Sequence, residues 1–499
     1  MGQILEPIAS GLTLEFLGLI LVGIFIGVIV GALPGISTSA MAALLAIFAY
    51  TMTPLHALIF IASAHVASTY GGSITAVVLN IPGTPASAAT CLEGYPLARR
   101  GEGELALSVS VMSSFWANAF AAILLILSMP LIARVAVFFD YWEMFWFSIF
   151  GVKICAQLSR GDVLKGLIAA CFGMIISFVG PDPILGTEAL RFTYGISYLQ
   201  NGVRLIPAMV GLYGIAIVFR QLTDVKTEAM ALERKKLFAW GEIWRHKWLV
   251  IRTSFLGFLV GVIPGVGSDV ASWVGYNHAY TSSKHKERFG TDETLEGVIG
   301  TETSNNACAV GSYAPMLALG IPGDGVTAVV LIVLAAQGVL IGPAFLGDNP
   351  EFLPLLFLSF MIAGIGFLLM GTFFSRAVIR LLNAPMPIVM ACVASLCVIG
   401  AFSASRRYED IALMFALGLV GLAMNKTQFP VAPMLLGIVV GGSLVDANFR
   451  WAILAGDGSL VPFFTRPLSL GLVLILALML FVEFVLPLFR RPRRKEKEK

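Results

Sequence analysis

The chain has 499 residues, of which 58% are hydrophobic and 13% charged, and its formal net charge is +3. A soluble globular chain carries about twice this charged fraction, so the composition excludes an ordinary soluble enzyme or binding domain. Apolar stretches of about 17 to 25 residues, long enough to cross roughly 30 Å of hydrocarbon as helix, recur along the whole chain. Examples are residues 105–132, 163–180, 353–373 and 467–488. The sequence therefore predicts an all-α polytopic integral membrane protein with about twelve transmembrane helices.

The chain is expected to divide into two halves. The first half covers residues 1–220 and contains a first repeat at about 12–100, followed by four spans near 105–132, 138–157, 163–180 and 205–221. A basic linker at 221–250 precedes the second half, 251–489, which contains a second repeat at about 251–346 and further spans. A basic tail occupies residues 490–499.

Lysine and arginine residues predict the orientation in the membrane. Residues 220–252 hold eight of them and the tail after Phe489 holds seven, so the positive-inside rule places the linker and the tail in the cytoplasm. Counting four spans back from Arg220 places the Arg99–Arg100 loop inside as well, and the segment 181–202 outside. The N-terminus is then expected on the periplasmic side. The sides of two further basic segments are left open: Lys284–Arg288 and Arg406–Arg407.

Two ordered sets of matching residues reveal the internal repeat. The first set, at an offset of 230 residues, pairs Gly27, Val30, Gly31, Pro34 and Gly35 with Gly257, Val260, Gly261, Pro264 and Gly265. The second set, at an offset of 240, pairs Gly71, Leu79, Ile81, Pro82 and Gly83 with Gly311, Leu319, Ile321, Pro322 and Gly323. Because the first copy ends inside and the second begins inside, we predict inverted repeats. Many secondary transporters are built this way and bind substrate where the repeats meet.

Each copy contains two Pro-Gly pairs within apolar sequence, and these are predicted to break helical hairpins. Proline removes a backbone donor, and glycine adopts almost any backbone angle. Ser, Thr, Asp or Pro follows each pair and can begin a new helix. A helix N-terminus offers free N–H donors and a positive dipole end, which favours binding of a carboxylate. The four breaks are GALPGISTSA (31–40), LNIPGTPASAAT (79–90), GVIPGVGSDV (261–270) and LGIPGDGVTAV (319–329).

Residues at and just after the breaks are the candidate substrate-binding residues. They are Pro34, Gly35, Ser37, Thr38, Ser39, Pro82, Gly83, Thr84, Ser87, Pro264, Gly265, Gly267, Ser268, Pro322, Gly323 and Asp324. The alternative for any one break is an ordinary proline kink, but four breaks, paired by the repeat and each with a polar cap, favour binding. For Asp324 and Asp269, simple N-capping is weighed evenly against a functional role.

Polar groups within apolar sequence are the candidates for binding a coupling ion, because ionisable groups in a membrane are costly and usually functional. These candidates are Asn80, Glu302, Ser304, Asn305, Asn306 and Asp324. A sodium ion would take oxygen ligands at unwound helices, whereas a proton needs a titratable carboxyl group. His65 and His278 are interpreted as hydrogen-bonded structural residues. Glycines spaced every four residues, such as Gly27 and Gly31, are interpreted as close helix packing.

Several chemistries have no signature in the sequence. There is no G-x-x-x-x-G-K-[ST] phosphate loop, no G-x-S-x-G and no H-E-x-x-H. The six cysteines show no metal-ligand spacing. We therefore expect no enzyme activity and no cofactor or metal apart from a coupling Na⁺ or H⁺, and we expect the driving energy to come from an ion gradient or another subunit.

Three long motifs resemble the large membrane subunit of the tripartite tricarboxylate transporter family. They are YGGSITAVVLNIPGTPASAATCLEGYPLARRG (70–101), ETSNNACAVGSYAPMLALGIPGDGVTAV (302–329) and FPVAPMLLGIVVGGSLVDANFRWAIL (429–454). The similarity extends over nearly the whole chain. Two departures lie outside the repeats: the family often has Glu in place of Asp446 and a second Arg in place of Trp451.

This resemblance implies a bacterial inner-membrane importer with two partners. One is a small membrane subunit of about four helices, and the other is a periplasmic solute-binding protein. It also implies uptake of small carboxylates such as citrate or tartrate, driven by a Na⁺ or H⁺ gradient. The exact carboxylate, the oligomeric state and the choice between rocking and sliding movements stay open. Two alternatives are a carrier for another small organic solute and a membrane scaffold without its own transport pathway.

Overall fold

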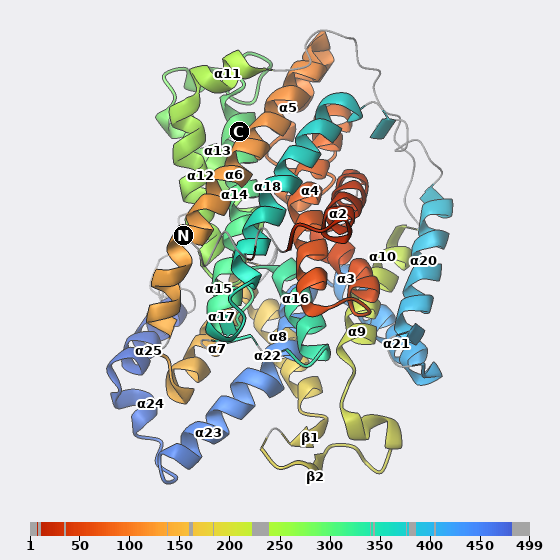
Figure 1. The fold of residues 1–499 in the computed structure, drawn as a ribbon, viewed down its shortest axis with the longest axis vertical. Helices are drawn as coiled ribbons and strands as arrows, with labels where there is room; N and C mark the ends of the chain where they lie inside the picture. Colours follow the sequence, from red (N-terminus) through yellow and green to blue (C-terminus); the bar gives the residue numbers. More distant parts are fainter. Residues whose placement is uncertain are drawn as a thin grey trace, which may run out of the picture.

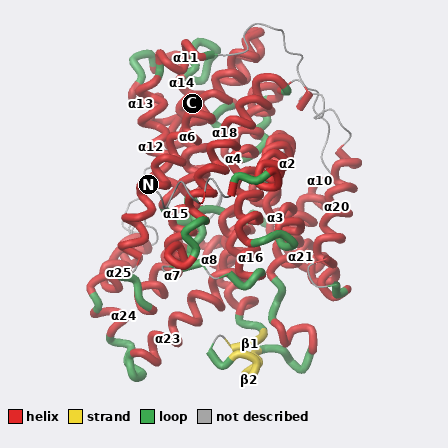
Figure 2. The backbone as a smooth tube through the Cα atoms, viewed as in Figure 1, coloured by secondary structure: helices red, strands yellow, loops and turns green. Residues whose placement is uncertain are grey.

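The computed structural model is built almost entirely of helices, and its described residues include one short antiparallel strand pair at one end (Figure 1 and Figure 2). The prediction of an all-α polytopic fold is confirmed. The structure describes residues 7, 11–33, 36–136, 138–158, 163–182, 184–221, 239–339, 341–342, 345–375, 377–378, 386–403 and 406–481.

The first repeat is a series of capped helices. Helix α2 (Leu14–Ala32) is capped by Thr13 and α3 (Thr38–Ala49) by Ser37, each through a side-chain oxygen that accepts a backbone N–H three residues on. Helix α4 (Pro54–Leu79) has every residue from Ala57 to Val78 buried, so it lies at the centre of the bundle. After the second break follow η1 (Pro85–Ser87), α5 (Cys91–Leu97), η2 (Ala98–Glu102) and the long α6 (Gly103–Ala136).

The second repeat follows the same order. Helix α12 (Lys247–Val262) is followed by a break and by α13 (Gly267–Ser282), and then by α14 (Glu296–Gly311) and α15 (Tyr313–Leu319). The fourth break leads into α16 (Gly325–Ala336). The short η5 (Lys286–Arg288) lies between α13 and α14, α17 (Phe345–Asp348) and the long α18 (Phe352–Phe373) follow α16, and α11 (Trp240–Arg245) precedes the repeat.

Glycine contacts show that the two repeats pack alike. A Cβ atom on Gly27 would collide with the carbonyl of Ala64, and one on Gly31 would collide with Ser68. In the second repeat Gly257 lies against Ser304 and Gly261 against Cys308. The glycines are 230 residues apart and their contacts 240 apart, which are the offsets of the sequence repeat. The glycine ladders therefore bring α2 onto α4 and α12 onto α14.

The correspondence continues beyond the sequence repeat. Helices α9 (Leu205–Met209) and α22 (Val431–Val440) each run into a π-helical turn, and each carries the proline of a Pro-x-x-x-Gly spacing, Pro207 and Pro433, at an offset of 226. The glycines of the two spacings are Gly211, in the turn after α9, and Gly437, within α22. Gly211 lies against the carbonyl of Met414, and Gly437 against that of Ala170. Each half thus adds a proline-containing helix packed on a neighbour. The remaining elements are α7 (Tyr141–Leu158), α8 (Val163–Ser177), β1 (Gly180–Asp182), β2 (Gly186–Arg191), η3 (Ser197–Asn201), η4 (Val210–Ile215), α10 (Ala216–Gln221), α20 (Met386–Ser403), α21 (Tyr408–Lys426), η6 (Gly441–Asp446), α23 (Ala447–Ala455), α24 (Pro462–Thr465) and α25 (Pro467–Leu480).

Helix lengths agree with several membrane crossings. Five described segments are individually long and apolar enough to span a bilayer: Leu14–Ala32, Pro54–Leu79, Cys91–Ile132, Phe352–Phe373 and Tyr408–Lys426. Shorter apolar helices, such as α3 and α16, begin just after the breaks. The expected number of about twelve crossings stays a prediction.

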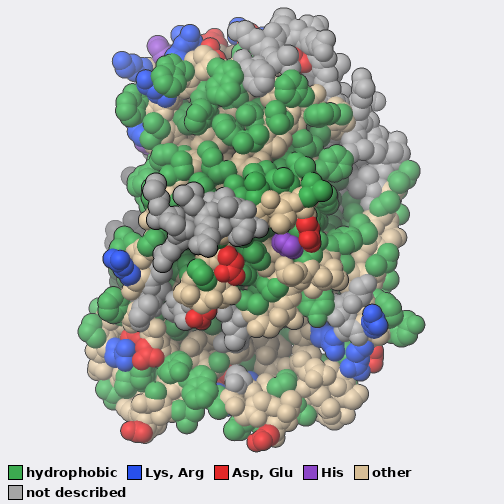
Figure 3. Space-filling model, in the orientation of Figure 1, with side chains coloured by type: hydrophobic (Ala, Val, Ile, Leu, Met, Phe, Trp, Pro, Cys, Tyr) green, Lys and Arg blue, Asp and Glu red, His purple; other side chains and the backbone are tan. Residues whose placement is uncertain are grey.

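Two basic segments lie together at the end of the molecule opposite the strand pair. Arg100 donates to the carbonyl oxygen of Asp292 at 3.2 Å, which joins the Arg99–Arg100 turn to the segment after Lys284–Arg288. Helix α11 and helix α5 lie at this end, and β1 and β2 lie at the other (Figure 1). The side left open for Lys284–Arg288 is therefore that of Arg99–Arg100. Figure 3 shows hydrophobic side chains over most of the visible face and basic groups toward its upper and lower ends.

Candidate functional site: a cavity at the four helix breaks

All four helix breaks contribute to the wall of one cavity of about 670 Å³. This volume is in the range of small-molecule sites. The break residues that line it come from both repeats, so the site exists only when the two halves are packed together. They are Ser37, Thr38, Ser39, Pro85, Gly265, Val266, Gly267, Ser268, Asp269, Pro322, Asp324, Gly325 and Ala328.

At the first break, the start of α3 lines the cavity. Ser37 Oγ accepts from the N–H of Ala40 at 3.2 Å and so satisfies one donor of the first turn. The hydroxyl-bearing residues Thr38 and Ser39 lie beside it on the wall. Ser39 also packs against Gly325, which places the N-termini of α3 and α16 next to each other. The candidates Pro34 and Gly35 lie outside the described residues.

The second break contributes less than the sequence suggests. Asn80 is exposed and left-handed at the end of α4 (φ 57°), and Pro82, Gly83, Thr84 and Ser87 are not among the lining residues described for the cavity. Thr84 is fully buried, and its hydroxyl has no hydrogen-bond partner among the described residues. Ser87 Oγ donates to the carbonyl of Thr84 at 2.8 Å. This break reaches the cavity through Pro85.

The third break supplies an uncapped helix start. Gly265 and Gly267 have φ values of 81° and 72°, which residues with a Cβ rarely adopt. Within the described part of the chain no side chain caps α13, so the first-turn N–H groups near Ser268 are available to an anion. The N–H of Gly265 donates to Gly323 O at 2.8 Å, which ties the third break to the fourth. Gly323 accepts this hydrogen bond and Pro264 directly precedes its donor. Neither residue is among the described lining residues.

At the fourth break, Asp324 is the N-cap of α16. Its Oδ1 accepts from the N–H groups of Val326 and Thr327 at 3.0 and 2.8 Å, in a capping box with the Thr327 side chain. The capping interpretation of Asp324 is therefore confirmed. A carboxylate of the protein itself thus occupies this helix N-terminus, while its Oδ2 lies 3.3 Å from Nε2 of His65.

The coupling-ion candidates are spread over three places. Asp324 lies on the cavity and Asn80 at the end of α4. Glu302 is fully buried between helices, where Ser73 and Thr90 donate to Oε1 and Ser114 to Oε2. The amides beside it bond within the protein, Asn305 to Ala86 O at 3.2 Å and Asn306 to Asn305 Oδ1 at 2.9 Å. Ser304 packs against Gly257.

The Glu302 cluster therefore joins α14 to three elements of the first half: α4 through Ser73, η1 through Ala86, and α6 through Ser114. Glu302 is not among the described lining residues of the cavity. Its hydrogen bonds connect the two halves of the molecule.

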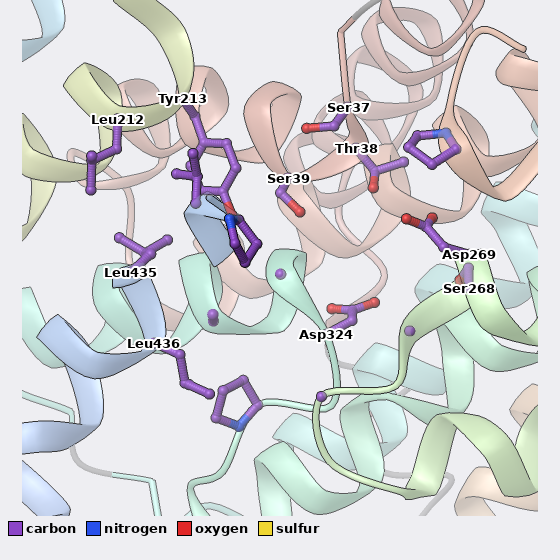
Figure 4. A pocket seen from close by; sticks show the side chains of 18 of the residues that line it. Ser37, Thr38, Ser39, Leu212, Tyr213, Ser268, Asp269, Asp324, Leu435 and Leu436 are labelled. Carbon is purple, nitrogen blue, oxygen red and sulfur yellow. The ribbon is translucent and has the colours of Figure 1, made fainter. Parts of the chain in front are cut away.

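The opposite wall of the cavity was not predicted from the sequence. Figure 4 shows Leu212, Tyr213, Leu435 and Leu436 facing the Ser37–Ser39 and Ser268–Asp324 side across the cavity. Arg220, Asn425, Gln428 and Phe429 complete this wall. Leu212 and Tyr213 belong to η4, Arg220 to α10, and Leu435 and Leu436 to α22; Asn425 is near the end of α21, and Gln428 and Phe429 lie between α21 and α22. The repeated Pro-x-x-x-Gly spacing at Pro207 and Pro433 is the signal that could have identified both helices.

Comparison with known families identifies the family of the chain. The model of the family described as "Tripartite tricarboxylate transporter TctA family" matches residues 17–436. The chain belongs to the TctA family. The match includes both repeats and all four breaks, so the cavity lies within the shared part of the sequence, and TctA proteins are components of tripartite transporters.

Two relatives of this TctA chain come from Agrobacterium vitis. An "uncharacterized 52.8 kDa protein in TAR-I ttuC' 3'region" is 32% identical over 476 residues, covering 95% of this chain and 94% of the relative. An "uncharacterized protein in TAR-II ttuC' 3'region" is 29% identical over 237 residues, covering 48% and 97%. No solved structure matches the chain.

Proposed function

We propose that this TctA chain is the membrane subunit through which a small carboxylate is imported, driven by a Na⁺ or H⁺ gradient and supplied by a periplasmic solute-binding protein. The observation that carries the proposal is the meeting of all four Pro-Gly breaks at one cavity. Broken helices at a repeat interface are the usual place for substrate in secondary transporters. The tripartite family adds the two partners, a small membrane subunit and the binding protein.

The carboxylate is proposed to bind at the start of α13, between the first and fourth breaks. This helix start carries no capping side chain among the described residues, and Ser268 lines the cavity beside it. N–H groups and hydroxyls directed at one point favour a carboxylate. Arg220 on the opposite wall adds a positive charge to the cavity, which favours a second carboxylate of a di- or tricarboxylate such as tartrate or citrate.

The orientation proposed from the sequence is retained. The Arg99–Arg100 turn and the Lys284–Arg288 segment lie at one end, and the β1–β2 pair lies at the other (Figure 1). The positive-inside rule places the basic end and the C-terminus in the cytoplasm. The strand pair is then on the periplasmic side of the inner membrane, where a binding protein would deliver substrate.

A second candidate substrate is a carboxylate with an apolar body. The wall opposite the helix starts contains Leu212, Ile217, Phe429, Leu435 and Leu436, which would bury a hydrocarbon or aromatic group more favourably than additional carboxylates. Competition between labelled citrate and either tartrate or phenylacetate separates the two candidates.

The test is uptake into proteoliposomes that contain this chain, the small membrane subunit and the binding protein. Labelled citrate and tartrate are offered with an inward Na⁺ gradient, an inward H⁺ gradient, or neither. We expect accumulation with a gradient and the binding protein, and loss of accumulation when either is omitted. Uptake that ignores both gradients would contradict the secondary-active proposal.

A further inference from the structure

His65 lies on the wall of the cavity, although its position in the middle of α4 suggests only a structural role. The side chain is 2% exposed, and its Nε2 is 3.3 Å from Asp324 Oδ2. Its Nδ1 is 3.5 Å from the hydroxyl of Tyr313. Both His65 and Asp324 line the cavity. A histidine–carboxylate pair is therefore placed beside the proposed carboxylate site.

The two oxygens of Asp324 have different roles. Oδ1 holds the start of α16 through the N–H groups of Val326 and Thr327 and the hydroxyl of Thr327. Oδ2 faces His65. A proton can therefore be gained or lost between Oδ2 and the imidazole while Oδ1 continues to cap α16.

The charges around the cavity make an anion costly unless a cation enters with it. Two carboxylates, Asp269 and Asp324, line the wall, and Arg220 lies on the opposite side. A substrate carboxylate at the start of α13 adds a further negative charge close to Asp324, and like charges repel each other at short distance. Protonation of the imidazole would turn the pair from net negative to neutral and remove part of this repulsion.

Other titratable groups lie on the helices that pack against α4. On the cavity wall, His65 is accompanied by Asp269 of α13 and Arg220 of α10. Of the groups on the packed helices, Asp324 and Tyr313 contact the imidazole. The titratable and charged groups on these helices are Glu15 on α2, Cys91, Glu93 and Tyr95 on α5, Glu104 and Arg134 on α6, Glu296, Glu302 and Cys308 on α14, and Asp324 at the start of α16; Tyr313 of α15 also lies near the imidazole.

Glu302 is the rival proton site, and its contacts lie within the protein. Hydroxyls of Ser73, Thr90 and Ser114 donate to its carboxylate. Glu302 is also not among the described cavity-lining residues, so a bound substrate would not lie directly against it.

We propose that the His65–Asp324 pair binds the proton that is carried inward with the carboxylate. The inference rests on the proposed function and narrows its coupling ion to H⁺. The proton enters with the substrate from the outer side, resides on the imidazole while the carboxylate is bound, and leaves to the cytoplasm with it. Because the coupling is reciprocal, proton binding and substrate binding each strengthen the other.

The test compares H65Q with the control H56Q in proteoliposomes with both partner proteins. His56 is on the same helix, outside the cavity, and pairs with Glu15 on α2. Two readouts are taken with labelled citrate and tartrate: exchange at equal pH, and accumulation driven by an acidic outer side. We expect H56Q to match the unmodified protein, and H65Q to retain exchange at raised substrate concentration while its accumulation ratio falls to about one.

The outcomes distinguish failure of the proton inference from failure of the proposed function. Accumulation by H65Q under the pH gradient, or accumulation by the unmodified protein with a Na⁺ gradient alone, would overturn the proton inference and leave the proposed function standing. Absence of exchange with every probe in the unmodified protein would overturn the proposed function and the inference with it.

A binding measurement on the unmodified protein tests the inference even if H65Q does not fold. Heats of binding for the unmodified protein are compared in phosphate and Tris, which differ in ionisation enthalpy. Uptake of one proton per substrate makes the two heats differ, whereas equal heats would overturn the inference.

Discussion

At the scale of single residues, the structure separates two hydroxyls that look equivalent in the sequence. Thr84 and Ser268 both follow a Pro-Gly break and both were candidates for binding the carboxylate. Ser268 lines the cavity at the start of α13, whereas Thr84 is fully buried and packs against Gly72. A hydroxyl that follows a break therefore reaches the site only if the start of the next helix faces the cavity.

Replacement of Ser268 by alanine should weaken substrate binding about tenfold, because a hydrogen bond to a charged group contributes roughly 1.5 kcal/mol or more. The matched variant T84A should change the dissociation constant by less than about twofold. Both constants are measured by equilibrium binding of labelled citrate or tartrate to the purified complex. Equal effects of the two variants would place the carboxylate elsewhere.

At the scale of helices, close approach at glycine sets the geometry of each repeat. Gly257 lies against the backbone of Ser304, so a methyl group there must push α12 away from α14. Gly18 on α2 has open space around its Cβ position. The same residue type thus has opposite consequences at two places on equivalent helices.

G257A should lower the midpoint of thermal unfolding in detergent, with a destabilisation of about 1–3 kcal/mol. G18A should leave the midpoint unchanged or raise it slightly, because alanine favours helix over glycine. An unchanged midpoint for G257A would mean that α12 and α14 do not depend on this contact.

The β1–β2 pair is attached to α23 through Asp182. The N–H groups of Ile184 and Leu185 donate to its carboxylate at 2.9 and 3.1 Å and, together with Arg450 and Arg191, hold the pKa of Asp182 below its ordinary value. Arg450 Nη1 lies 2.6 Å from Asp182 Oδ2. A lowered pKa means that the folded state favours the charged carboxylate.

This attachment should be fully present above the ordinary pKa of an aspartate, near 3.9, and should be lost as the pH falls through the lowered pKa of Asp182. Hydrogen exchange of residues 184–191, corrected for intrinsic rates, measures it. D182N should show weakened protection already at pH 7, while E188Q, an acid-to-amide change at an exposed position of β2, should not. Normal protection in D182N would contradict the role of the ion pairs.

At the scale of the whole molecule, the sequence predicted the helix breaks, which occur in both repeats. It did not predict the cavity residues that come from outside the repeats. Pro-Gly pairs identified the breaks because proline and glycine act on the backbone where they stand. Tyr213, Arg220 and Gln428 line the same cavity from η4, α10 and the turn after α21, all outside the sequence repeat. Their contribution depends on how α10 and α21 pack against the repeats, which no local pattern encodes.

The role proposed for His65 could not be predicted from the sequence for a related reason. Nothing in the sequence around it differs from that of a buried structural histidine, and the proposal depends on its contact with Asp324, 259 residues later in the chain. The capping role of Asp324 could be anticipated from its place before α16, but the direction of its second oxygen could not.

The central claim, that the carboxylate binds in the cavity at the breaks, is tested most directly by substrate protection of a single cysteine. Thr38 lines the cavity at the start of α3, and Thr51 lies exposed just past the end of the same helix. T38C and T51C are made in a background in which the six native cysteines are replaced, and the rate of thiol modification is measured with and without citrate or tartrate.

We expect saturating substrate to slow modification of the cysteine at position 38 by about tenfold or more, because a bound ligand blocks most access to it. The rate at position 51 should stay unchanged. Equal rates at position 38 with and without a substrate that the complex transports would contradict the central claim.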